Sequence, residues 1–92
     1  MIRYQYEPEN KRVAAYEGDT EAGFCSYKEK EEMWIIISTK VHDDFTGKGI
    51  ASGLVDRLLQ TAKEKKRKIV PFCPFAADYV ELHQKEYGDL LK

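Results

Sequence analysis

A glycine-containing loop and one cysteine carry the residue types in this sequence that are suited to chemistry. The loop spans residues 46–51, TGKGIA, and opens a predicted helix, and Cys73 closes the next predicted strand. Glycine lets a backbone approach a ligand without an intervening Cβ, and the first amides of a helix have no intrahelical partner. Such a loop can bind a phosphate or pyrophosphate, to which Lys48 adds a full charge. The alternative is a glycine turn that merely starts the helix.

Single residues exclude two common phosphate-binding loops. A Walker loop requires Lys and Ser or Thr directly after its last glycine, and here Leu54 follows Gly53. A dinucleotide-binding loop requires a third glycine or an alanine at the position where Ser52 stands. It also requires a carboxylate at the end of the next strand, which ends in Cys73. The loop therefore belongs to neither class.

A β-α-β unit is expected to position the loop and the cysteine. Met33–Val41 predicts a central strand covered on both faces, because it opens with a continuous apolar run. From Ile50, apolar residues recur at helical spacing over about 17 residues, and Asp56 lies on the opposite, polar face. Residues 69–73 form the second strand. Two strands joined by such a helix are expected to be parallel.

The remaining elements complete an α+β fold with a mixed sheet. Antiparallel strands are predicted at residues 11–16 and 22–28, and residues 3–6 form an edge strand or a tail. A C-terminal helix is predicted for Phe75–Lys85. The side of this helix that should pack on the core consists of Phe75, Ala76, Tyr79, Val80 and His83. The residues expected to fold back on the core after it are Tyr87, Leu90 and Leu91.

The composition is that of an ordinary globular domain. The 92 residues are 42% hydrophobic and 34% charged with a formal net charge of −1. This predicts one domain, residues 1–92, and disfavours a dedicated nucleic-acid binder. No apolar stretch approaches the ~20 residues of a membrane span and no signal peptide opens the chain, so no membrane partner is expected. Two cysteines without a disulfide framework favour a cytoplasmic location, and the small size predicts a monomer or weak homodimer.

Three other groups of residues have both a structural and a chemical interpretation. The basic cluster at residues 63–68 is interpreted as a solvated helix end. A phosphate-binding patch for nucleic acid is the alternative, but no aromatic residues alternate with the basic ones. His42 and His83 lack metal-ligand spacing to each other or to a cysteine pair, so no metal is expected. Cys25 is interpreted as a small packing residue.

Residues 41–51 resemble motif A of the GNAT superfamily of N-acetyltransferases. In that motif a strand ending in valine leads to Gln or Arg, two residues, glycine, one residue, and glycine or alanine, which opens a long helix. Gly49 and Ala51 match the last two places, and Thr46 stands where Gln or Arg is usual. The chain length and the Pro-x-Cys segment at Pro71–Cys73 are similar to those of the short single-domain GNAT subfamily.

The resemblance implies a reduced GNAT fold and acetyl-CoA, hence coenzyme A, as the cofactor. It implies that loop amides hold the pyrophosphate and that pantetheine lies between a splayed fourth and fifth strand, bonded to main chain near Val41. A backbone amide there would polarise the thioester carbonyl. The cofactor-binding residues implied in this way are Val41, Thr46, Gly47, Lys48, Gly49, Ile50 and Ala51.

The same resemblance would place Cys73 near the thioester. Cys73 is then the expected catalytic residue, either as a nucleophile that accepts the acetyl group or as a group that assists the leaving thiol. A small residue that lines the cofactor channel is the alternative. Many superfamily members use a tyrosine of the following helix as the acid. Tyr79 is nearest to that place, but its position on the apolar face of the helix favours packing.

The predicted function is acetyl-CoA-dependent transfer of an acetyl group to an unidentified amine of a protein, peptide or small molecule. The alternative is a CoA-binding module or interaction domain with little or no catalysis. Full-length GNAT domains carry two helices between the first and second strands, which build much of the acceptor pocket. Here a tight turn at residues 17–20 predicts an open acceptor side.

Overall fold

A five-stranded mixed sheet forms the centre of the computed structural model, which describes residues 1–91. The strands are β1 (Ile2–Glu7), β2 (Arg12–Glu17), β3 (Thr20–Lys30), β4 (Met33–Val41) and β5 (Lys68–Pro71). They lie in the order β1-β2-β3-β4-β5; neighbours from β1 to β4 are antiparallel, and β4 and β5 are parallel. The α+β fold with a β-α-β unit is therefore confirmed.

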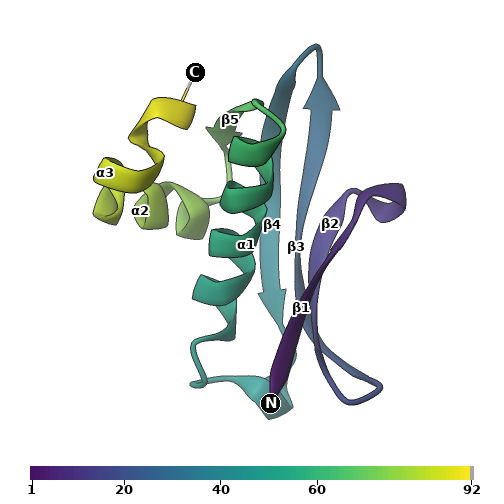
Figure 1. Ribbon diagram of the computed structural model, residues 1–92. Helices are drawn as coiled ribbons and strands as arrows, with labels where there is room; N and C mark the ends of the chain where they lie inside the picture. The colour runs from purple at the N-terminus through teal and green to yellow at the C-terminus, as the bar shows by residue number, and fades with distance from the viewer. Residues whose placement is uncertain (92) are drawn as a thin grey trace.

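Helices cover the sheet and extend beyond β5. They are α1 (Ile50–Glu64), α2 (Pro74–Leu82) and α3 (Gln84–Tyr87), with short 3-10 turns at Pro8–Asn10, Asp43–Phe45 and Gly88–Leu90. α1 lies against the sheet, and α2 and α3 lie on the side of the molecule away from β1 (Figure 1). Within residues 1–91, none of the helices is both long and apolar enough to cross a bilayer.

The apolar stripe of α1 forms the core together with the inward side chains of the sheet. Leu54, Leu58 and Leu59 are fully buried and belong to the same cluster as Trp34 and Ile36 of β4. Burying each such side chain contributes roughly 2 kcal/mol relative to exposure. The periodicity in the sequence thus placed the buried face of α1 correctly.

A β-bulge interrupts β4 at its middle. Ile36 pairs with Tyr27 of β3 and Ser38 pairs with Ser26, so Ile37 is an extra residue in the ladder. Before the bulge the even-numbered residues face the core. After it the odd-numbered residues do so, because Thr39 contacts the buried thiol of Cys25 on the core side.

The expectation that β4 is covered on both faces is wrong. Trp34 and Ile36 are buried under α1, whereas Met33, Ile35 and Ile37 remain partly exposed. The continuous apolar run arises because three hydrophobic residues also occupy the opposite face and the bulge. An apolar run alone does not separate these two cases.

The N-terminal strands follow the sequence pattern closely. β1 pairs with β2 along its whole length, so residues 3–6 belong to an edge strand and are no tail. β2 and β3 turn tightly at Gly18, whose φ of 61° favours glycine. β3 is longer than predicted and reaches Lys30, which leaves two residues, Glu31 and Glu32, to connect it to β4.

The C-terminal segment differs most from its predicted form. The helix predicted for residues 75–85 ends at Leu82, and a separate turn of helix, α3, follows His83. Ala76 and Val80 are buried as expected, but Phe75 is 40% exposed. β5 ends at Pro71, so Cys73 lies in the bend before α2 and not in the strand. Proline at the first position of α2 favours this early start.

A partly buried carboxylate holds this segment against α1. Asp56 Oδ1 accepts hydrogen bonds from the hydroxyls of Tyr79 (2.8 Å) and Tyr87 (2.7 Å), and Oδ2 accepts one from Gln60 (2.6 Å). The sequence places Asp56 on the polar face of the helix, but this part of the face is not left to solvent, because α2 and α3 fold over it. The predicted anchoring role of Tyr87, which is fully buried, is confirmed.

Candidate functional site

β4 and β5 diverge after a short stretch of pairing. Their register runs from Met33 opposite Lys68 to Ile36 opposite Pro71. One further main-chain bond follows, in which the amide of Cys73 donates to the carbonyl of Ile36 at 2.9 Å. β4 continues to Val41, while the chain after Cys73 turns away into α2. The second half of β4 therefore has an open edge toward α2 within the described residues.

The main-chain groups on this open edge can be assigned from the opposite edge. The amide of His42 donates to the carbonyl of Ala22 at 2.8 Å, so His42 directs its main-chain groups toward β3. Successive residues of a strand point these groups to alternate sides. Thr39 and Val41 consequently direct their N–H and C=O groups to the open edge. An extended ligand lying there can bond to main chain as an added strand would.

The loop from His42 to Gly49 leads from this edge to α1. The hydroxyl and the amide of Thr46 both bond to the carbonyl of Asp43, which closes the 3-10 turn. Gly47 and Gly49 have φ values of 79° and 74°, in the left-handed region that favours glycine. Across the described chain, no side chain caps the first turn of α1. Its amides are therefore available to an anion.

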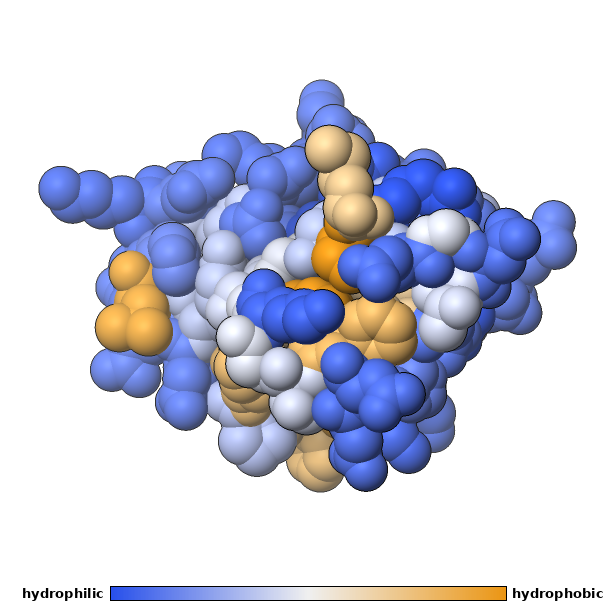
Figure 2. All heavy atoms as spheres, turned by 90° about the horizontal axis from the view of Figure 1, so that it is seen from below, coloured by the Kyte–Doolittle hydropathy of each residue, from blue (hydrophilic) through white to orange (hydrophobic). Residues whose placement is uncertain are grey.

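A shallow pocket of about 290 Å³ joins the loop to the open edge. The residues that line it are Val41, Phe45, Thr46, Gly47, Gly49, Ile50, Ala51, Ser52 and Phe75. Figure 2, which views the molecule from the end that carries the loop, shows hydrophobic side chains exposed within a hydrophilic surround. Six of the seven predicted cofactor residues thus line one pocket.

The seventh predicted cofactor residue, Lys48, does not line this pocket. Its ammonium lies 5.6 Å from the centre of the Phe45 ring, an arrangement that favours a cation–π contact. Ile50 is 2% exposed, so its side chain belongs to the core and only its backbone remains for a ligand. The groups that the loop can offer a ligand are therefore mainly its main-chain N–H donors, with the exposed charge of Lys48 beside them.

Volume alone does not identify the pocket at the loop. A larger hollow of about 520 Å³ lies at the far end of the sheet, lined by Glu31, Glu32, Met33, Lys66 and Lys68. It is bounded by exposed charged side chains of both signs, its lining contains no glycine, and it lies beyond the C-terminal end of α1. The pocket at the loop is distinguished by its glycines, its helix start and its open main-chain edge.

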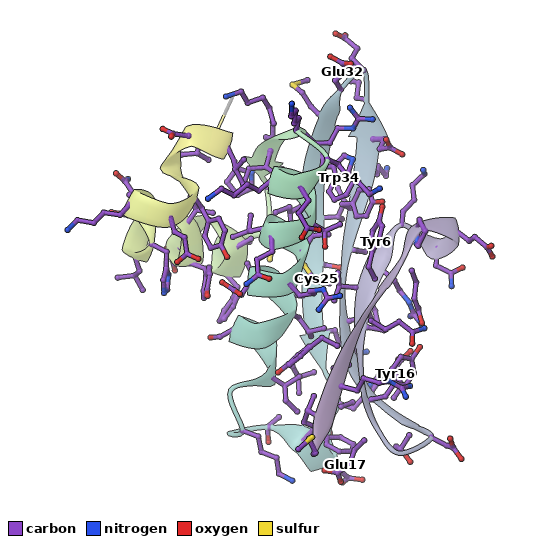
Figure 3. All side chains as sticks on the ribbon, viewed as in Figure 1. Tyr6, Tyr16, Glu17, Cys25, Glu32 and Trp34 are labelled. Carbon is purple, nitrogen blue, oxygen red and sulfur yellow. The ribbon has the colours of Figure 1, made fainter. Side chains whose placement is uncertain are left out.

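Cys73 lies among buried polar atoms on the core side of β4. It is 6% exposed, and its Sγ lies 3.6 Å from the hydroxyl oxygen of Thr39. The Thr39 hydroxyl also donates to Cys25 Sγ at 3.4 Å. Cys25 lies between α1 and the sheet (Figure 3). Burial raises the pKa of the Cys25 thiol to about 11, and the hydrogen bond from Thr39 opposes part of that rise.

A chain of polar and charged side chains lies beside His42, where the loop begins. Nε2 of His42 lies 2.9 Å from Glu21, whose other oxygen lies 2.9 Å from the guanidinium of Arg12. Arg12 also bonds Glu7, and Glu7 accepts a hydrogen bond from Tyr16. The hydrogen bond with His42 and the charge of Arg12 lower the pKa of Glu21. His42 is thus fixed beside Val41 by a hydrogen bond with Glu21 that the sequence did not indicate.

The hydroxyl of Tyr79 is committed to Asp56, and its ring stacks on His83 with centroids 4.1 Å apart. Burial, followed by the hydrogen bond to the Asp56 carboxylate, raises the pKa of Tyr79 well above its ordinary value. The interpretation of Tyr79 as a packing residue therefore agrees with its surroundings.

The comparison with protein families decides the assignment. A family model described as GCN5-related N-acetyl-transferase matches residues 6–90. The chain belongs to the GCN5-related N-acetyltransferase family. This membership supports a general acyltransferase activity. A search among curated proteins finds no match for the chain.

Several residues around the pocket and Cys73 were not predicted. Phe45, Ser52 and Phe75 line the pocket, and Thr39 contacts both cysteines. Ser52 and Phe45 lie next to the predicted loop and could have been included by proximity. Phe75 lies in the first turn of α2, whose start Pro74 indicates. Thr39 faces the core because of the bulge, which has no clear signal in the sequence.

Proposed function

We propose that this N-acetyltransferase transfers an acetyl group from acetyl-CoA to an amine. The observation that carries the proposal is the open edge of β4, which runs from the contact with Cys73 to the glycine loop at the start of α1. A diphosphate at one end and a thioester at the other would then be bound by one continuous surface.

The loop supports the diphosphate end of this arrangement. Its two glycines expose backbone, and a Cβ built on either would meet nothing within 4 Å, so a ligand has room to approach. The first amides of α1 provide donors at the positive end of the helix dipole. Lys48 is exposed and adds a charge at the rim. These groups match the charge and size of a pyrophosphate.

The open edge supports the pantetheine end. The N–H and C=O groups of Thr39 and Val41 can bond the amides of a pantetheine arm as an added strand would. A main-chain N–H beside the thioester would polarise its carbonyl. Val41, Phe45 and Phe75 supply apolar contacts on the pocket wall.

Cys73 is the proposed nucleophile. Its sulfur forms a bond to the acyl carbon as the bond from that carbon to the sulfur of coenzyme A breaks, and the Cys73 proton ends on the departing thiol. A neutral amine then attacks the acetyl group on Cys73. The new C–N bond forms as the C–S bond breaks, and the amine proton returns to the Cys73 sulfur. The short turns between β1, β2 and β3 leave room for a large acceptor such as a peptide.

The test is a titration of acetyl-CoA into the protein followed by amide chemical shifts, combined with an assay for free coenzyme A thiol over a panel of amines. We expect the largest shifts at Val41, at residues 47–51 and at Cys73. Cys73→Ala should retain binding and lose turnover and the acetyl adduct. Lys66→Ala, at the exposed far end of α1, is the matched control and should bind as the unsubstituted protein does.

Three outcomes would count against the proposal in different ways. No binding at millimolar acetyl-CoA removes the cofactor. Binding without turnover favours a CoA-binding module. Shifts confined to residues 63–68 move the ligand to the basic cluster and overturn the assignment of the loop.

A further inference from the structure

We propose that Thr39 is a positioning residue, whose hydroxyl turns from Cys25 to Cys73 when Cys73 loses its proton. The inference rests on the proposed function only for its consequence in catalysis. The contacts themselves are a property of the folded chain, so they can be examined without coenzyme A.

One hydroxyl lies between two thiols in this arrangement. Thr39 Oγ1 is 3.4 Å from Cys25 Sγ and 3.6 Å from Cys73 Sγ, both within hydrogen-bonding distance for sulfur. Thr39 has a single hydroxyl hydrogen, so it can donate to only one of the two sulfurs at a time. In the state described here it donates to Cys25, and its oxygen is left to accept from the thiol of Cys73.

The two thiols differ in what surrounds them. Cys25 is fully buried between α1 and the sheet and stays a neutral thiol. Cys73 lies at the bend before α2, where the chain leaves the open edge of β4. Under the proposed function Cys73 is the thiol that reacts, and Cys25 serves as the alternative partner of the hydroxyl.

The exchange keeps the number of hydrogen bonds. When Cys73 gives up its proton to solvent water, the Thr39 hydroxyl rotates about its C–O bond and donates to the Cys73 thiolate. The Cys25 S–H can then donate to the Thr39 oxygen in place of the bond it accepted before. A hydrogen bond to a charged sulfur is stronger than one to a neutral thiol, so the rotation follows the charge. The side chain that makes this possible faces the core only because of the bulge at Ile37.

The test is the rate at which iodoacetamide alkylates Cys73 in the intact protein as a function of pH, measured by mass spectrometry of the Cys73 peptide. We expect Thr39→Val, which keeps the shape and removes the hydroxyl, to slow alkylation at pH 7 by about tenfold and to move its pH midpoint upward. Thr39→Ser should restore both. Cys25→Ala leaves the hydroxyl free to donate to Cys73 and should not slow the reaction.

Labelling of Cys25 in the same spectra reports on folding, because a fully buried thiol reacts only when the core opens. An unchanged pH midpoint in Thr39→Val would overturn the proposal, as would a Thr39→Ser variant as slow as Thr39→Val. If Thr39→Val also makes Cys25 reactive, the rate of Cys73 alkylation in Cys25→Ala decides instead. A rate slower than that of the unsubstituted protein would overturn the proposal. Failure of acetyl-CoA binding would overturn the proposed function and leave this labelling pattern intact.

Discussion

The two edges of β4 differ in how much of the strand they pair. Toward β3, every residue of β4 except Ile37 has a partner. Toward β5, the strand pairing ends at Ile36, and the end of β4 at Val41 lines a pocket. Glycine occurs beside both edges for opposite reasons. At Gly23 an added Cβ would lie 2.3 Å from the Lys40 carbonyl oxygen, whereas at Gly49 it would meet nothing within 4 Å.

This difference separates packing from ligand access within one strand. The edge of β4 toward β3, here called the closed edge, has contacts so close that no atom can be added. The open edge is defined by backbone groups that have no protein partner in the described chain. Substitutions at the closed edge should therefore act on stability, and substitutions at the open edge should act mainly on binding. Four experiments test that division, in order of decreasing effect.

The largest effect is expected for Gly23→Ala. The new methyl group would collide with the main chain of β4 at Lys40 and force the two strands apart. We expect a loss of about 3 kcal/mol in the free energy of unfolding, measured in urea. Gly18→Ala is the control, because only its positive φ opposes a side chain, and it should cost about 1 kcal/mol. Equal stability of the two variants would show that the closed edge yields more easily than its geometry suggests.

Asp56→Ala should have the next largest effect. It leaves the buried hydroxyl of Tyr87 and the hydroxyl of Tyr79 without their acceptor, at a cost of about 2 kcal/mol. Hydrogen exchange should accelerate in α2, which forms the far wall of the open edge. In a Tyr87→Phe background the same substitution should cost less stability, because only the Tyr79 hydroxyl then loses its acceptor. Equal costs in both backgrounds would mean that this hydrogen bond does not couple the helices.

A smaller, pH-dependent effect on stability is expected for Arg12→Met in β2, the strand that pairs with β3. Arg12 lies between Glu7 and Glu21, and hydrogen bonds and charge lower the pKa of both carboxyl groups. Groups with a lowered folded pKa contribute stability above their unfolded pKa and lose it as pH falls through the folded pKa.

The variant should therefore be about 1 kcal/mol less stable at pH 7, and the difference should shrink below the ordinary glutamate value of 4.5. Urea unfolding at pH 7, 5 and 3 measures it. A difference that stays constant with pH would assign the effect to the contact of the Arg12 guanidinium with the Phe24 ring.

The smallest stability change is expected for Gly49→Ala. Its φ of 74° would cost a residue with a Cβ about 1 kcal/mol, with no collision to add. Under the proposed function, affinity for coenzyme A should fall by more than this stability loss implies, because the loop amides shift. Gly88→Ala, at a glycine with ordinary helical φ, is the matched control and should change neither. Unchanged affinity in Gly49→Ala would argue against the diphosphate site.

Local patterns explain how far sequence reasoning reached. The apolar spacing of α1, the turn at Gly18 and the glycines at the start of α1 are each encoded within a few consecutive residues. These signals predicted the β-α-β unit and the loop of residues 46–51, five of which line one pocket. The resemblance to N-acetyltransferases supplied the rest of the expected chemistry.

Features that depend on distant parts of the chain were missed. Asp56 looked solvated because the polar face of α1 shows no sign that two tyrosines from α2 and α3 will cover it. Cys73 was placed in a strand because Pro71 and Pro74 fix the bend only in combination with the divergence from β4. Thr39 was overlooked because its direction depends on the bulge, which follows from pairing with β3 and not from the residues of β4 alone.

Because β4 contains one extra residue at the bulge, the number of residues in this strand decides which side chains face the core. Removing Ile37 would leave a regular ladder in which Ser38 still faces outward and Thr39 still faces the core. Removing a second residue between Ile36 and Thr39 would reverse the facing of everything that follows. The Lys40 ammonium would then turn toward the leucines of α1, and the Thr39 hydroxyl would turn toward solvent. Related chains should consequently keep this number of residues or lack only the bulge residue.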